Sequence, residues 1–354
     1  MESKRTVTAK LVSFLAAMFV FAIFTLHAEA APRIMPGGEI FDPEYYAANN
    51  PDVAAQLGTD PQALYQHYRD YGKAEGRLPY DPAASLDELL APRPVTLGDK
   101  TFSSTDTEVD LTGMDVKELD MDAFFAQMPY LQKVIMINCG LSTIEYAALQ
   151  DAHPEIKLVW QFMIANRYVR TDAVAISTMV ADWKTSPHTT DAQTWCLKYC
   201  TDLIGLDLGH NYIRDLSFLE YMPNLKVLIL VDNCGLSDFS ALKYCTKLKY
   251  LEIFVNGCRD LSFLDYMPEL EDLNISFNPI YNIDHLHDIE HLRRLWIVNS
   301  RISADDYLAL KAEYPDTVIV NSGPNSIGSG WRTDSHFYAM RRLFIYNMPN
   351  DIYY

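Results

Sequence analysis

The chain has 354 residues, and 49% of them are hydrophobic, so it is long and apolar enough to bury a sizeable core. It contains 47 acidic and 29 basic residues, which gives a formal net charge of −18 at pH 7. A charge of this sign repels nucleic acid and anionic membrane surfaces, so the composition argues against a nucleic-acid partner.

The first 30 residues have the three parts of a secretory signal peptide. Basic residues among the first ten are followed by the apolar run 11–26 and by Ala28, Glu29 and Ala30, a small-x-small cleavage site. The apolar run is also close to the length of a membrane anchor, but the cleavage site favours removal after Ala30. We therefore expect a secreted or cell-surface protein whose mature chain has no transmembrane segment.

Residues 31–80 are expected to form a small all-α module, followed by a proline-containing linker at 81–100. An Asp-Pro pair at 60–61 starts a helix, and apolar and tyrosine side chains follow it at helical spacing up to Gly72. The pattern D-P-x-Y-Y…N-P-D-V…H-Y…G resembles a small helical module of secreted and surface bacterial proteins. Its tyrosines either close a small core, which we favour, or contact sugars of the cell wall.

Four copies of a nine-residue phrase, L-x-x-L-x-L-x-x-N with some leucines replaced by isoleucine, recur at a period of 22 or 23 residues. They begin at Leu203, Leu225, Leu248 and Leu270 and align without gaps. The alternating apolar residues predict a short strand with one buried face. A period of this length predicts a solenoid in which the strands of successive coils stack into a parallel sheet.

The residue that ends each phrase lies where the chain must turn. An Asn amide at this point can both donate to and accept from backbone groups inside the coil. Looser copies of the phrase begin at Leu131 and Leu292, with Cys and Ser at the corresponding position. The predicted structural ladder therefore consists of Cys139, Asn211, Asn233, Asn256, Asn278 and Ser300.

Together the repeats predict an α/β fold: a right-handed leucine-rich repeat solenoid over 101–322, with a parallel sheet on its concave face. Residues 162–199 fit no repeat and are expected to be an elaborated coil or an insertion. Segments between the phrases, such as RDLSFLDYMPE from Arg259, resemble the internalin-like class of bacterial leucine-rich repeats. That resemblance implies protein or cell-surface binding without enzymatic activity.

The outward positions of the predicted strands form the candidate binding face, which is more aromatic than contact with solvent requires. Two functions remain open. The face can recognise a protein or glycan partner at the cell surface, or the helical module can attach to the cell envelope while the repeats act as a structural spacer. The candidate binding residues are Tyr250, Glu252, Phe254, Asp272, Asn274, Phe277, Arg294 and Trp296.

Residues 323–354 are expected to form a C-terminal cap or tail. After a glycine-rich stretch, Phe337, Met340, Phe344 and Met348 recur at helical intervals and need a surface to cover them. The tail either closes the open end of the solenoid, which we favour, or folds over the aromatic residues of the concave face.

Residues with reactive side chains give weak signals. His287 and His291 lie four residues apart, but a solvated polar turn explains them better than a metal site. No nucleophile elbow, phosphate-binding loop or Cys/His dyad occurs, so we expect neither an enzyme nor a cofactor. Most of the six cysteines are out of register for a disulfide, although a bridge between Cys234 and Cys258 stays open, and we expect buried free thiols.

Overall fold

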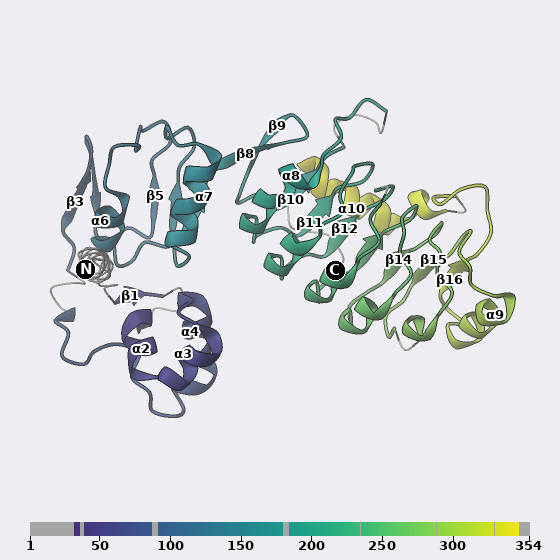
Figure 1. Ribbon diagram of the computed structural model, residues 1–354, viewed down its shortest axis with the longest axis horizontal. Helices are drawn as coiled ribbons and strands as arrows, with labels where there is room; N and C mark the ends of the chain where they lie inside the picture. Colours follow the sequence, from purple (N-terminus) through teal and green to yellow (C-terminus); the bar gives the residue numbers. More distant parts are fainter. Residues whose placement is uncertain are drawn as a thin grey trace, which may run out of the picture. The chain divides into compact units, whose positions relative to one another are not determined.

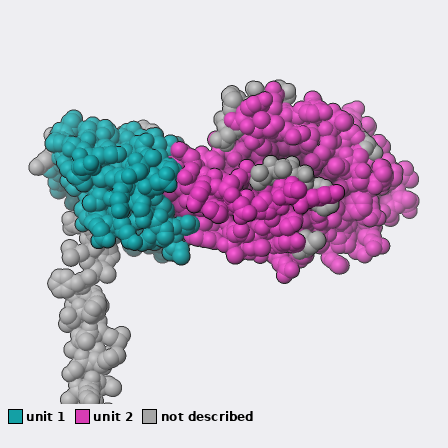
Figure 2. Space-filling model, turned by 90° about the horizontal axis from the view of Figure 1, so that it is seen from above, with its two compact units in different colours: residues 1–158 teal, residues 159–354 magenta. Residues whose placement is uncertain are grey.

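The computed structural model describes residues 32–35, 39–86, 91–179, 184–233, 235–287, 289–328 and 330–346. The predicted signal peptide, Cys234 and Met348 lie outside these ranges. Within them, no helix is both long enough and apolar enough to cross a bilayer. The chain divides into two compact units, residues 1–158 and 159–354, which Figure 2 colours separately.

The first unit begins with a small helical module. The strands β1 (Arg33–Ile34) and β2 (Ile40–Phe41) pair antiparallel and precede α2 (Pro43–Asn49), α3 (Pro51–Leu57) and α4 (Pro61–His67). Helix α4 continues into a π-helical turn, η1 (Tyr68–Gly72). Each α-helix starts with proline at its first position, where the missing N–H has no intrahelical partner to lose. The core contains Phe41, Tyr46, Leu64, Tyr65 and Tyr68, so three of the six tyrosines of the module close a small core.

The first unit also holds a hairpin and a short parallel sheet. The hairpin consists of β3 (Pro94–Leu97) and β4 (Lys100–Ser103). The predicted linker at 81–100 is therefore too long: Val95 and Leu97 are buried and alternate with exposed residues, as a strand with one covered face requires. The sheet has the order β5 (Glu108–Asp110), β6 (Lys133–Ile135) and β7 (Lys157–Val159). Helices α6 (Met121–Ala126) and α7 (Thr143–Ala152) connect its strands.

The second unit is built on a seven-stranded parallel sheet whose strands lie in sequence order (Figure 1). Equivalent leucines of the repeat phrase occupy opposite positions on neighbouring strands, and Leu206, Leu228, Leu251, Leu273 and Leu295 form one fully buried column. The chain is therefore an α/β leucine-rich repeat solenoid. Its strands are β10 (Ala175–Ser177), β11 (Gly205–Asp207), β12 (Val227–Ile229), β13 (Tyr250–Glu252), β14 (Asp272–Asn274), β15 (Arg294–Trp296) and β16 (Val318–Val320).

Short 3-10 helices form the outer turns of the coils, and longer helices lie at the end of the array. A period of 22 or 23 residues leaves too few residues in a coil for a full crossover helix, so most connections are single turns. The 3-10 helices are η2 (Trp195–Tyr199), η3 (Ser217–Tyr221), η4 (Ser240–Tyr244), η5 (Ser262–Tyr266) and η6 (Asp284–Leu286). The C-terminal elements are α9 (Ala304–Glu313), η7 (Trp331–Thr333) and α10 (Ser335–Tyr346).

Of the two interpretations of residues 162–199, the structure supports an elaborated coil rather than an insertion outside the repeats. It contains an antiparallel hairpin, β8 (Gln161–Ile164) with β9 (Arg167–Arg170), and a short helix, α8 (Asp191–Thr194). It also contains β10, which joins the large sheet with Ile176 opposite Leu206. This strand could not be predicted from the sequence, because Ile176 is its only large apolar residue. Strands of the repeats thus form two parallel sheets, with the hairpin between them in the chain, rather than one continuous sheet.

The ladder residues bind backbone groups inside the coils. The Asn233 amide donates to the carbonyl oxygens of Leu208 and Leu230, both at 3.0 Å, and its oxygen accepts from the Ile213 N–H at 3.0 Å. Asn211, Asn256 and Asn278 make equivalent bonds, the Ser300 hydroxyl donates to Ile297 at 2.8 Å, and the Cys139 thiol donates to Leu111 at 3.0 Å. Each ladder residue therefore satisfies carbonyl groups that the turn would otherwise leave buried and unpaired.

Candidate functional site: the covered concave face

The C-terminal segment, residues 321–328 and 330–346, crosses the concave face of the β10–β16 sheet. Near β15, the Gly328 carbonyl oxygen accepts a hydrogen bond from the indole N–H of Trp296 at 3.0 Å. At the other side, α10 contacts β10, and Leu343 packs on Gly205 of β11 so closely that a Cβ atom on Gly205 would collide with it. The segment thus passes over most of the sheet, and Figure 1 shows α10 beside β10 to β12.

An apolar layer joins the segment to the sheet. Trp331 is fully buried, with its ring centroid 5.5 Å from that of Tyr250 and 5.0 Å from that of Trp296. Aromatic pairs at these distances gain more than their buried area alone provides. Phe337, Met340 and Leu343 of α10 are no more than 5% exposed and complete the layer over β11 to β13.

A buried carboxylate lies under the turn that precedes α10. Glu252 is fully buried, and it accepts a hydrogen bond from the indole N–H of Trp331 at 2.8 Å and one from Arg332 at 3.0 Å. The Tyr250 hydroxyl is its third donor. Because a buried charge needs partners, these contacts fix which residues of the segment can lie over β13.

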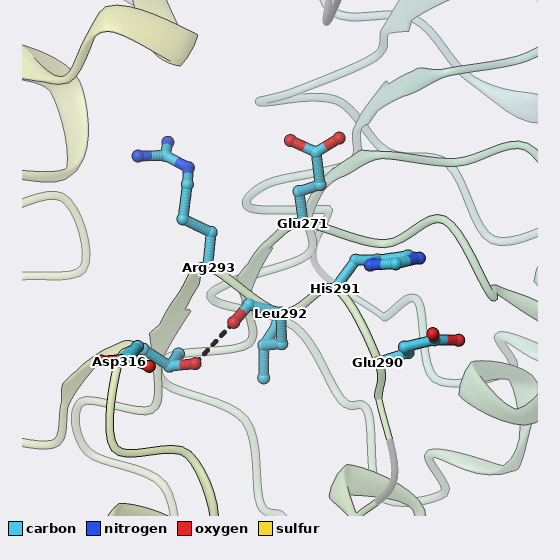
Figure 3. A pocket seen from close by; sticks show the side chains of 7 residues that line it. Glu271, Glu290, His291, Leu292, Arg293 and Asp316 are labelled. Atoms are coloured by element: carbon cyan, nitrogen blue, oxygen red, sulfur yellow. Dashed lines mark hydrogen bonds between the residues drawn. The ribbon is translucent and has the colours of Figure 1, made fainter.

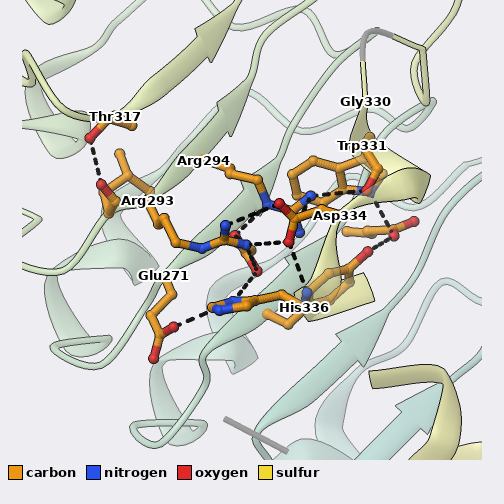
Figure 4. A network of polar contacts seen from close by, with 12 residues as sticks. Glu271, Arg293, Arg294, Thr317, Gly330, Trp331, Asp334 and His336 are labelled. Carbon is orange, nitrogen blue, oxygen red and sulfur yellow. Dashed lines mark hydrogen bonds and ion pairs between the residues drawn. The ribbon is translucent and has the colours of Figure 1, made fainter. Parts of the chain in front are cut away.

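A second carboxylate, Asp272, lies in an ionic network on β14 and β15 (Figure 4). It accepts hydrogen bonds from Arg294 at 2.6 Å and Arg293 at 3.1 Å, and the His336 ring lies 3.1 Å away. Burial disfavours its charged form, but these three groups outweigh burial and lower the pKa of Asp272. Arg293 also binds Asp334 at 2.7 Å, so the network ties this part of the sheet to Asp334, which directly precedes α10, and to His336 in its first turn.

Two neighbouring contacts extend the polar layer. The Arg294 guanidinium lies 4.3 Å from the Trp331 ring centroid and donates to the Trp331 carbonyl oxygen at 2.9 Å. On β11, burial raises the pKa of Asp207, whose carboxylate accepts from the Ser177 hydroxyl at 2.9 Å. Ion pairs of this kind add little net stability, but losing one partner leaves a buried charge. They therefore specify the register of the segment more than they strengthen it.

The candidate binding residues do not form the open surface that the sequence analysis predicted. Tyr250, Glu252, Phe254, Asp272, Asn274, Arg294 and Trp296 are buried, and Phe277 is half-buried. The exposure assigned to them was wrong because alternation along a strand tells which side a residue faces and not what covers that side. The structure does bring all eight together on one side of the sheet.

The favoured role of the tail, closing the end of the solenoid, is also wrong. The tail instead folds over the concave face, because Phe337 and Met340 pack on the aromatic residues of that face. Sequence reasoning missed Trp331, Arg332, Asp334 and His336 as partners of the sheet. The tryptophan directly after the glycine-rich tether was the available signal, since a large aromatic ring gains free energy when it is covered.

The other candidate sites show no convergent chemistry. His287 pairs with Glu313, and the described residues contain no group of three potential metal ligands. A surface hollow of about 430 Å³ is lined mainly by charged residues, including His291 and Arg293, whose side chains point away from each other in Figure 3. All five described cysteines are buried free thiols.

Comparison with known proteins gives a likeness in fold. No protein-family model matches the chain, and no curated protein matches its sequence. Among solved structures, it is similar to an internalin of Listeria monocytogenes (21% identity over 56% of this chain, TM-score 0.39) and to internalin C2 of the same organism (18% over 52%, TM-score 0.32). A leucine-rich repeat protein of Leptospira interrogans is similar over 63% of this chain, with 14% identity and a TM-score of 0.31.

These matches cover 50%, 87% and 56% of the respective structures, so the chain spans half the length of the first internalin. The assignment of the fold rests on the chain's own parallel register and on the hydrogen bonds of its ladder. The chain is a leucine-rich repeat solenoid similar to the internalins, with a concave face that its own C-terminal segment covers.

Proposed function

We propose that this chain is an exported, non-enzymatic protein-binding module of the bacterial surface or secretome. Its partner would bind to the concave side of the solenoid while the C-terminal segment covers the sheet. The observation that carries the proposal is that this face already recognises a peptide segment by contacts typical of protein interfaces. Trp331 is anchored between two aromatic rings, and Arg294 stacks on it.

The magnitude of the segment's contacts favours the closed form as the one that a partner meets. Trp331, Phe337, Met340 and Leu343 are all buried. At roughly 1.5–3 kcal/mol for each large apolar side chain, they contribute roughly 6–12 kcal/mol before the entropy of ordering the segment is subtracted. A partner that displaced the segment would have to offset the part of this free energy that remains after that entropy, whereas a partner that binds the closed form would not.

Export is a separate part of the proposal and rests on the signal-peptide pattern. N-terminal sequencing of the protein recovered outside the cytoplasm should begin at Ala31. Recovery of the full-length chain only from the cytoplasm would remove this part of the proposal.

Site-specific photo-crosslinking tests partner binding. A photoreactive phenylalanine analogue would replace one exposed tyrosine at a time in the intact chain: Tyr338 on α10, Tyr266 at the end of η5, or Tyr71 in the helical module. These side chains have similar exposures, 54%, 53% and 61%. We expect one defined protein adduct from position 338 and none from position 266.

The other outcomes separate the alternatives. An adduct from position 71 alone would support the envelope-attachment and spacer function instead. The absence of a protein adduct from all three positions, in cells that export the chain, would overturn the binding function.

A further inference from the structure

Helix α10 has a second face that the sheet does not use. Its inner residues pack on the concave aromatics, whereas Tyr338, Arg341, Arg342, Ile345 and Tyr346 lie at intervals of three and four residues on the opposite face. Tyr338, Ile345 and Tyr346 are 54%, 60% and 63% exposed, and both arginines are exposed. We call these five residues the outer stripe.

The charge of the outer stripe is opposite to that of the chain. Ser335–Tyr346 contains two arginines and no acidic residue, although the formal net charge of the protein is −18. Neither guanidinium takes part in an ion pair within the part of the chain that the structure describes. Arg341 lies 5.8 Å from the Phe337 ring centroid, so packing accounts for one of the two arginines. It does not account for Arg342 or for the exposed Ile345 and Tyr346.

The composition of the stripe is that of a binding hot spot. Tyrosine and arginine are enriched among the residues that dominate interface affinity, and exposed aliphatic side chains gain most from being covered. The helix that carries them is held by its buried face, so the stripe is presented in a fixed geometry. Pre-organisation of this kind lowers the entropy that binding must offset.

We propose that the outer stripe of α10 is a docking surface for an acidic patch on a partner protein. This inference rests on the proposed binding function and names the chemistry of the partner. The stripe, from Tyr338 to Tyr346, is about 12 Å long, at about 1.5 Å for each helical residue, which suits a compact patch. A nucleic acid or an anionic bilayer presents a continuous negative surface that would also meet the acidic remainder of the chain, and this repulsion argues against both.

The test uses the intact mature chain and two synthetic helical peptides with the same leucine and phenylalanine positions, one rich in glutamate and the other in lysine. Binding is measured by fluorescence anisotropy at low and high salt. We expect the glutamate peptide to bind, the lysine peptide not to bind, and the affinity to fall as the salt concentration rises. Failure of the glutamate peptide to bind would overturn the proposal.

Matched charge reversals locate the site. Arg341→Glu with Arg342→Glu should weaken binding of the glutamate peptide at least tenfold. The control, Arg259→Glu with Arg301→Glu, changes the net charge equally at two exposed positions on other elements and should weaken it less than twofold. Equal losses in both variants would mean that only overall charge matters. Binding of the unaltered chain to phosphatidylglycerol vesicles through the two arginines of α10 would point to a membrane instead, and either result would overturn the proposal.

Crosslinking from position 338 separates this inference from the proposed function. If Arg341→Glu with Arg342→Glu abolishes the adduct while near-ultraviolet circular dichroism is unchanged, the inference is supported. If the adduct persists at full yield, the inference fails and the binding function stands. If the chain with unaltered arginines gives no adduct, the binding function itself fails.

Discussion

Replacing Trp331 by Ala is the sharpest perturbation of the covered concave face. The ring is fully buried against Tyr250 and Trp296, and a buried tryptophan truncated to alanine loses about 3–5 kcal/mol. The change also removes one of the donors of the buried Glu252 carboxylate, which costs about 1–3 kcal/mol more. The expected loss of about 4 kcal/mol or more is a large part of what the segment contributes.

This loss should appear as local release of the segment. Hydrogen exchange followed by mass spectrometry would measure protection of the α10 amides. Since each 1.4 kcal/mol is tenfold, protection should fall by about a thousandfold. The amides of β13 and β14 that bond to neighbouring strands should keep their protection. Tyr338→Ala is the control, because this side chain is on the same helix, points away from the sheet and should change stability by about 0.5 kcal/mol or less. Undiminished protection of α10 in Trp331→Ala would refute the reasoning.

Three further predictions concern the rest of the second unit, and a fourth concerns its thiols. Asn233→Ala should lower the free energy of unfolding by about 1–3 kcal/mol in urea, because buried carbonyls lose their donor; an unchanged midpoint would contradict the role of the ladder. Val255 has a φ of 59°, which disfavours a β-branched residue, so Val255→Asn should stabilise the protein by about 1 kcal/mol in the same assay, and a loss would count against strain at this turn. Burial disfavours the charged form of Asp334, but Arg293 outweighs it and lowers the pKa from 3.8 to about 2. The stability that this carboxylate contributes is therefore present above pH 4 and lost as the pH falls towards 2. Asp334→Asn should reduce the change of the urea midpoint with pH in that range. An unchanged slope would exclude this ion pair as the source of the pH dependence. Burial raises the pKa of Cys245 to about 12, so iodoacetamide at pH 8 should label it only after unfolding, and rapid labelling of the native protein would show that the coil opens.

The repeat architecture could be predicted because the residues that define each coil lie close together in the sequence. The leucines, the turn and the ladder residue all lie within nine consecutive positions, and four copies in register exclude a chance pattern. The positions of Leu228 and Asn233 therefore followed from local spacing alone. Strand β10 was missed because Ala175 and Ser177 flank a single large apolar residue, which leaves no periodic signal.

The covering of the concave face could be predicted only in part. The period of Phe337 and Met340 indicated that the tail needs a surface, but it gave no information on which surface. The hydrogen bond from Trp331 to Glu252, which places the tail on the concave face, joins two residues that are 79 positions apart in the sequence. Pairings over such distances depend on the three-dimensional path of the tether, and no local pattern encodes that path. The outer stripe was overlooked for a related reason, since its exposure is defined only once the inner face has been placed.

Hydroxyl-radical footprinting of the intact chain tests most directly whether the C-terminal segment covers the concave face. Oxidation of Tyr250 and Trp296, which are 0% and 2% exposed, would be compared with that of Tyr266, which is 53% exposed and serves as an internal reference. If the segment covers the face, Tyr250 and Trp296 of the intact chain should be oxidised far more slowly than the reference. Both should become reactive in a chain that ends at residue 330. Oxidation of Trp296 in the intact chain at the rate of the exposed reference would contradict this covering.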